Sequence, residues 1–187
     1  VLDYINDENI ERYQLEYELA LTSLLYYYRN IYIDDWDVNK DLKFEYLLLD
    51  FLKQYRPENI EKIAKVLAEI IFDVGDANEK FSYSFQLLAL YEKENYLDDS
   101  FFENNRYLNY IEEPEKNIEY YNRAINLIGL SKERGFSVSE VEEALVYASL
   151  GQAYSTLGDR NKAEDHFLSA IDLIDNKGSD LSTDSSN

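Results

Sequence analysis

Apolar residues recur every three or four positions along most of the chain, the spacing that places them on one face of an α-helix. Three stretches show this spacing most clearly: Ile60, Ile63, Ala64, Leu67, Ile70 and Ile71; Ile118, Tyr121, Ile125 and Ile128; and Ala163, Phe167, Ala170 and Ile174. No stretch between turn residues alternates polar and apolar positions as a half-buried strand does, although the Tyr-rich residues 26–33 have a strand-like composition. The pattern therefore predicts an all-α fold.

Residues that begin or end helices help to place the expected elements. We expect helices near residues 7–31, 40–55, 57–73, 77–95, 100–111, 114–131, 138–157 and 160–175, of which 100–111 has the weakest pattern. The prolines that fit a first helical turn are Pro57 and Pro114. The glycines that fit a C-terminal cap are Gly75, Gly158 and Gly178. Ser137 with Glu140 predicts a capping box before residue 138, and Asp159 predicts a cap for the last helix.

Residues 144–175 carry a spaced signature across the last two expected helices. Its members are Tyr147, Leu150, Gly151, Tyr154, Ala163, Phe167 and Ala170. Small residues at positions such as Gly151 and Ala163 let two antiparallel helices approach closely, and the aromatic rings fill the space beside them. This signature resembles the tetratricopeptide repeat (TPR) family. It departs from the family pattern only at the closing proline, where Asp175 stands.

Weaker copies of the signature occur in residues 41–72 and 81–130. The first contains Phe44, Leu47, Leu48 and Phe51, and the second contains Ser84, Leu87, Leu88 and Tyr91. The resemblance implies a TPR-like α-solenoid of antiparallel helix pairs, with about three repeats and an N-terminal capping helix. We expect one domain over residues 1–175, an insertion at 96–114 within the middle repeat, and a disordered tail at 176–187. The alternative is an irregular helical bundle that contains one chance TPR pair.

The charge of the chain is strongly negative. It has 38 Asp and Glu against 18 Lys and Arg in 187 residues, for a formal charge of −20. A protein that binds nucleic acid neutralises phosphates with Lys and Arg, so we expect no nucleic-acid partner. No apolar run reaches the ~20 residues that cross a bilayer, so we expect a soluble protein that lies inside the cell, in the cytoplasm, with an organelle or the nucleus left open. Because the chain opens at Val1, we expect it to be a piece of a longer protein.

The chemistry that the side chains offer is limited. The chain has one His and no Cys, and it contains no glycine-rich phosphate-binding motif. His166 is expected on the partly exposed surface of the last helix. Residues 35–41 resemble the start of an EF-hand loop, but Lys40 occupies the Gly position and Tyr46 the position of the bidentate Glu, so we expect an acidic loop in which Asn39 or Asp41 caps the next helix. We therefore expect no catalytic activity, no cofactor and no metal.

Two surfaces are candidates for binding a partner. The first is a concave face formed by the first helix of each repeat, and its lining is predicted to include Glu45, Leu49, Leu52, Phe85, Ala89, Glu92 and Gln152. The second is the insertion, where aromatic and acidic side chains are interspersed: Asp98, Asp99, Phe101, Phe102, Tyr107 and Tyr110. Such a mixture suits Lys and Arg of a partner. The alternative is that these aromatic rings pack onto neighbouring helices as core.

Two functions remain open at this point. The first is a scaffold or adaptor for protein–protein interaction, which binds a peptide or helix of a partner with net positive charge through the concave face, the insertion or both. The second is a peptide-sensing regulatory domain of a larger TPR regulator, as the resemblance to bacterial regulators with long TPR-like arrays implies. An effector segment attached to the chain would favour the second function.

Overall fold

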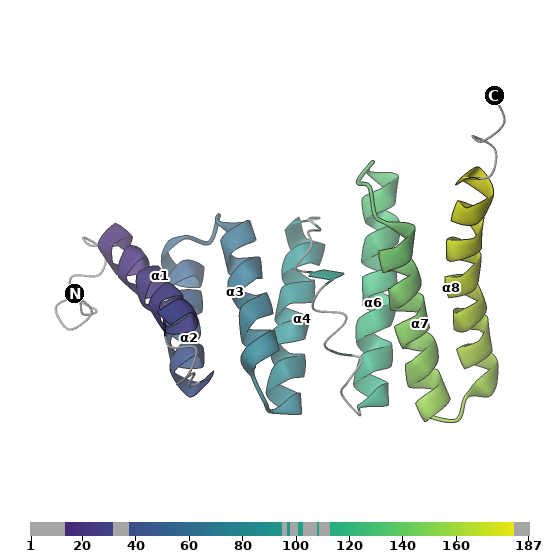
Figure 1. The fold of residues 1–187 in the computed structure, drawn as a ribbon, viewed down its shortest axis with the longest axis horizontal. Helices are drawn as coiled ribbons and strands as arrows, with labels where there is room; N and C mark the ends of the chain where they lie inside the picture. The colour runs from purple at the N-terminus through teal and green to yellow at the C-terminus, as the bar shows by residue number, and fades with distance from the viewer. Residues whose placement is uncertain are drawn as a thin grey trace. The chain divides into compact units, whose positions relative to one another are not determined.

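The computed structural model describes residues 14–31, 38–94, 97, 101–102, 108 and 113–181. In these residues all regular secondary structure is helical (Figure 1). The helices are α1 (Gln14–Ile31), α2 (Val38–Tyr55), α3 (Ile60–Asp73), α4 (Ala77–Glu94), α6 (Pro114–Glu133), α7 (Glu140–Thr156) and α8 (Arg160–Leu181). The predicted all-α fold is confirmed. Of the weak helix predicted at 100–111, the described residues Phe101, Phe102 and Leu108 are helical.

The two prolines behave differently at the helix starts. Pro114 is the first residue of α6, as predicted. Pro57 lies in a turn before α3, because the Asn59 side chain accepts a hydrogen bond from the Lys62 amide at 3.4 Å and makes Asn59 the N-cap residue. The prediction that Pro57 stands in a first helical turn is therefore wrong. An Asn or Asp that binds an exposed amide decides the start of the helix, which proline alone cannot do.

The helix ends show which glycines end a helix. Gly158 has a φ of +81°, and the Asp159 amide donates to the Tyr154 carbonyl at 3.0 Å, which is the Schellman pattern. That predicted cap is confirmed. Gly135, which the sequence analysis missed, ends α6 in the same way with a φ of +85°. Gly75 follows an extended Val74 after α3 and has no positive φ, and Gly178 lies inside α8, so these two predictions are wrong.

The starts of α7 and α8 give one correction and one confirmation. α7 begins at Glu140 and its N-cap residue is Ser139, which makes no side-chain cap hydrogen bond. The predicted pair of Ser137 and Glu140 is therefore wrong, because Glu140 is the first helical residue and not the third. Asp159 accepts a hydrogen bond from the Lys162 amide at 3.3 Å and caps α8, as predicted.

Helix α8 is longer than the sequence predicts. It continues to Leu181, whereas we expected it to end at residue 175 and a disordered tail to begin at 176. Extending an existing helix needs no new nucleus, so the unfavourable residues after Asp175 do not stop it. The rest of the predicted tail, residues 182–187, lies outside the described residues.

The chain divides into two compact units, Val1–Leu87 and Leu88–Asn187, with the boundary inside α4. The prediction of one domain over residues 1–175 stays a prediction. In the first unit, α3 buries one apolar face, formed by Ile63, Ala64, Val66, Leu67, Ile70 and Ile71. Glu18 of α1 forms ion pairs with Lys62 of α3 and with Arg56, which follows α2.

Helices α2 and α4 run in the same direction within the first unit. Tyr46 donates a hydrogen bond to Glu79 at 2.8 Å, and seven residues further along both helices Lys53 donates to Gln86 at 2.7 Å. Both pairs join residues 33 positions apart. Since α3 lies between α2 and α4 in the sequence, two parallel helices are connected here through a third.

In the second unit, the last turns of α4 are joined to α6. Arg123 of α6 donates two hydrogen bonds to Glu92, from Nε to Oε1 at 3.0 Å and from Nη2 to Oε2 at 2.6 Å. The described part of the insertion also packs here, because the Phe101 ring meets the Tyr91 ring edge-on at 5.4 Å. Side-chain contacts therefore join α4 to α6, although the two helices are separated in the sequence by the insertion.

Helices α6, α7 and α8 complete the second unit. A hydrogen bond between the side chains of Tyr121 and Ser149 joins α6 to α7, and Lys132 pairs with Glu143. Between α7 and α8 a buried glycine, Gly151, faces Phe167 and the Ala163 carbonyl. The close approach of these two helices at a small residue is the packing that the sequence signature predicts.

Candidate partner-binding site

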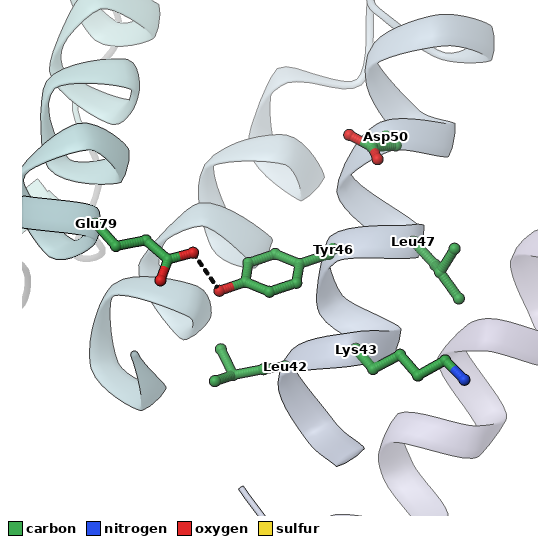
Figure 2. A pocket seen from close by; sticks show the side chains of 6 residues that line it. All are labelled: Leu42, Lys43, Tyr46, Leu47, Asp50 and Glu79. Atoms are coloured by element: carbon green, nitrogen blue, oxygen red, sulfur yellow. Dashed lines mark hydrogen bonds between the residues drawn. The ribbon is translucent and has the colours of Figure 1, made fainter. Parts of the chain in front are cut away.

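A surface hollow of about 520 Å³ lies on α2 beside the start of α4 (Figure 2). Its lining residues are Leu42, Lys43, Tyr46, Leu47, Asp50 and Glu79. Five of the six lie within nine positions of α2, in pairs one turn apart, so they share one side of that helix. Glu79 is the only lining residue from α4.

Tyr46 and Glu79 give the hollow a fixed wall. Figure 2 shows the Tyr46 side chain reaching from α2 to the Glu79 carboxylate of the neighbouring helix, where the 2.8 Å hydrogen bond forms. The Tyr46 ring also stacks on Tyr83 of α4, with centroids 5.7 Å apart. Burial raises the pKa of the Tyr46 phenol, and the hydrogen bond to Glu79 raises it further. The phenol therefore stays a donor at all physiological pH values and holds the Glu79 carboxylate in place.

The electrostatic character of the hollow is acidic. Asp50 and Glu79 contribute two carboxylates against the single ammonium of Lys43. Burial raises the pKa of Tyr83 behind the hollow, and the negative charges of Glu79 and Asp50 add to that shift. Apolar side chains of Leu42 and Leu47 provide the remaining contact surface. The lining can bind an apolar stem that ends in a cationic group.

The structure corrects the predicted lining of the concave face on α2. Glu45 is fully buried, with 0% of its surface exposed, and Leu49 and Leu52 are also buried in the core. The expectation that these three side chains line an open surface is wrong. Leu47, which the repeat signature assigned to the core, is instead partly exposed in the hollow. Leu48 and Phe51 of the repeat signature are buried as predicted, so the buried face of α2 extends beyond the predicted one to Glu45, Leu49 and Leu52.

Two buried carboxylates were missed by the sequence analysis. Asp41 and Glu45 lie one turn apart on the buried side of α2. We expected Asp41 or Asn39 to cap the helix, but α2 begins at Val38, so both residues lie inside it and that prediction is wrong. The EF-hand-like stretch falls partly on residues 32–37, which lie outside the described residues. The signal for the buried pair was present in the spacing of four from Asp41 to Glu45 and on to Leu49.

The other predicted members of the concave face lie at or near the surface. Phe85 and Glu92 of α4 are half-buried, while Ala89 of α4 and Gln152 of α7 are exposed. Glu92 is engaged in the ion pair with Arg123. Phe85 has a ring contact with Phe81 one turn earlier. The lining of the hollow by Tyr46, Leu47 and Glu79 was not predicted.

The described part of the insertion follows the alternative that treats its aromatic residues as core. Phe101 and Phe102 are buried, and their rings meet edge-on at 5.0 Å. The expectation that these two side chains bind a partner at the surface is wrong, because their apolar surface is covered within the protein. Asp98, Asp99, Tyr107 and Tyr110, the other predicted binding residues of the insertion, lie outside the described residues.

Two tyrosines of the repeat signature stack on the single histidine of the chain, His166. Leu150, Gly151, Ala163 and Ala170 are buried, while Tyr147, Tyr154 and Phe167 are at least partly exposed. The His166 ring stacks on Tyr154 at 5.4 Å and on Tyr147 at 6.2 Å. Its partly exposed position on the last helix agrees with the prediction. Burial lowers the pKa of His166 below its usual 6.5.

Two further features concern ions and membranes. Within the described ranges, no group of three or more His, Cys, Asp or Glu side chains is arranged to hold a metal ion. Of the helices in the described part of the chain, none has the length and apolar character needed to cross a bilayer.

No protein-family model, curated protein or solved structure was found to match this chain. The resemblance to the TPR family therefore rests on the residues of the chain alone and stays a prediction.

Proposed function

We propose that the protein is an interaction scaffold of TPR-like helix pairs that binds a Lys- or Arg-bearing segment of a partner protein. The observation that carries this proposal is the acidic, partly apolar hollow on α2, in which Tyr46 and Glu79 are held in a fixed arrangement. A cationic side chain has an apolar stem and a charged end, and the hollow offers surfaces for both.

The arrangement of the helices supports a repeated architecture. The pairs Tyr46–Glu79 and Lys53–Gln86 relate two parallel helices by 33 residues, close to the 34-residue period of TPR proteins. The close contact of α7 and α8 at Gly151 supports helix pairing of the same kind. In such arrays the exposed sides of parallel helices form the surface that binds a partner.

Charge supports the choice of a basic partner. A chain with a net charge of −20 attracts a positive segment from a distance, and the carboxylates of Asp50 and Glu79 then bind it at short range. The Tyr46 hydroxyl donates to Oε1 of Glu79, so the other carboxylate oxygen, Oε2, can accept a hydrogen bond from the partner.

The test compares three full-chain baits in extracts of the native cells: the wild type, Asp50→Lys and the control Glu115→Lys. Both variants change the net charge equally, but Glu115 is an exposed residue of α6 outside the hollow. We expect a partner, identified by mass spectrometry, to be captured by the wild type and by Glu115→Lys and to be lost from Asp50→Lys.

The purified partner then allows a kinetic test. Raising the salt concentration from about 50 to 500 mM shortens the Debye length to a few ångströms, so we expect the association rate to fall roughly tenfold. Equal capture by Asp50→Lys and wild type, or an association rate independent of salt, would exclude the hollow as the site of a basic segment.

A further inference from the structure

One side of α8 exposes a row of large apolar side chains. Phe167, Leu168, Ile171 and Ile174 are 36%, 51%, 50% and 52% exposed. Among the residues of α8 whose side chains the structure describes, the small Ala163 and Ala170 are the buried ones. Helix α8 thus contacts α7 through these alanines and Phe167, and leaves Leu168, Ile171 and Ile174 about half exposed.

Helix α7 exposes apolar residues on the same side of the hairpin. The contact line between the helices runs from the His166 stack on Tyr154 to the packing of Phe167 on Gly151. In an antiparallel pair of right-handed helices, positions that continue past Phe167 on α8 and past Gly151 on α7 lie on one side. These positions include Leu168 and Ile171 on α8 and the exposed Val141 and Leu145 on α7. We call the six residues Val141, Leu145, Phe167, Leu168, Ile171 and Ile174 the α7–α8 face.

An exposed apolar surface built from two adjacent helices is a common docking site for a third helix. Single exposed apolar residues need no explanation, but here residues one and two turns apart form a continuous row. A helix laid along the hairpin would place its own residues at i, i+3, i+4 and i+7 against that row.

The charges around the α7–α8 face select the kind of helix. Glu164, Leu168, Ile171 and Asp175 follow one another at spacings of four, three and four, so two exposed carboxylates stand at the ends of the apolar pair. Asp172 adds a third exposed carboxylate on α8, and Arg160 at the start of the helix is a basic residue on this side. A second copy of the chain would bring the same acidic border, whereas Lys and Arg would complement it.

We propose that the α7–α8 face docks one amphipathic helix of a partner, with an apolar stripe bordered by Lys and Arg. This site is distinct from the hollow on α2, and its residues belong to other helices. The proposal does not depend on the function assigned to the hollow. It gives the protein a second recognition element, which binds the apolar stripe of a helix, whereas the hollow binds a Lys- or Arg-bearing segment.

The probe is a fluorescein-labelled peptide of about 18 residues, or five helical turns, with Leu along one face and Lys on its borders. A second peptide has the same composition in an order without a Leu stripe, and a third has Glu in place of Lys. Fluorescence anisotropy with the full chain should show binding of the first peptide only. If the second peptide, which lacks the Leu stripe, binds as tightly as the first, charge alone explains the binding and the proposal is overturned.

Substitutions locate the site. Ile171→Gln should weaken binding of the Leu–Lys peptide roughly tenfold, the loss expected for a central apolar anchor. The matched control is Leu130→Gln on α6, because Leu130 is 48% exposed and Ile171 50%. Glu164→Lys should weaken binding and flatten its salt dependence. All three variants change exposed residues, so circular dichroism should show an unchanged helical signal.

Sedimentation of the chain without peptide, from low to high concentration, tests whether a second copy of the chain covers the α7–α8 face. We expect a monomer across the range. A dimer that Ile171→Gln dissociates would show that a second copy covers the face, and an affinity for the peptide unchanged by Ile171→Gln would show that the peptide binds elsewhere. Either result would overturn the proposal.

Discussion

Gly151 is a position of close approach between α7 and α8, and Gly151→Leu tests that contact. A Cβ atom at this position would lie 2.9 Å from Cδ1 and Cε1 of Phe167 and 3.2 Å from the Ala163 carbonyl oxygen. Carbon atoms in contact prefer about 3.5–4.0 Å. The first added carbon alone therefore requires about 0.6 Å of movement by the Phe167 ring, and the rest of the Leu side chain requires more.

The expected loss combines two opposing terms. Overpacking a close contact costs about 1–3 kcal/mol. Replacing a helical Gly by Leu returns about 0.7 kcal/mol, because Leu has the higher helix propensity. The difference between the two is a net loss of about 0.3–2.3 kcal/mol, which corresponds to a Tm lower by roughly 1–9 °C for a chain of this size. The Phe167 ring is partly exposed and can move, which keeps the expected cost in the lower part of the range for overpacking.

The matched control is Gly129, which lies inside α6, is exposed, and has no neighbouring atom within 4 Å of an added Cβ. Gly129→Leu should stabilise by about 0.7 kcal/mol from propensity alone. Urea unfolding followed by circular dichroism measures both variants. If Gly151→Leu is as stable as the wild type, or gains stability as Gly129→Leu does, the close packing of α7 and α8 is refuted. The cost of Gly151→Leu should also shrink in a Phe167→Ala background.

Three further predictions concern side-chain contacts. A double-mutant cycle on Arg123 and Glu92 should give a coupling energy of about 0.5–1 kcal/mol that decreases with salt, since both groups are about one-third exposed; zero coupling at low salt would contradict the α4–α6 contact. NMR titration of His166, the only histidine, should give a pKa below 6.5. Because the pKa of His166 is lower in the folded than in the unfolded chain, the contribution of His166 to stability is present above pH 6.5 and is lost as the pH falls through the folded pKa. His166→Gln should remove that part of the pH dependence of stability. Tyr46→Phe should lower the free energy of unfolding by about 0.5–1.5 kcal/mol through loss of the hydrogen bond to Glu79, and an unchanged urea midpoint would mean that this bond contributes nothing.

The sequence by itself determined where helices form and where two of them pack closely. A helix depends on residues three and four apart, so the apolar stripe of α3, the start of α6 at Pro114 and the end of α7 at Gly158 were all predictable locally. The same holds for the contact of α7 with α8, because Gly151 and the alanines of α8 allow close approach whichever helices lie nearby.

The tertiary structure alone decided which side of α2 is buried. That helix has apolar residues on every side, including Leu42, Leu47, Leu48 and Leu49, so its periodicity fits more than one orientation. The partners of its surface, such as Glu79 for Tyr46, lie more than thirty residues away, and local spacing does not encode such a distance. Packing against distant helices fixes the orientation of α2, which buries Glu45 and leaves Leu47 at the surface, and the hollow results from that orientation.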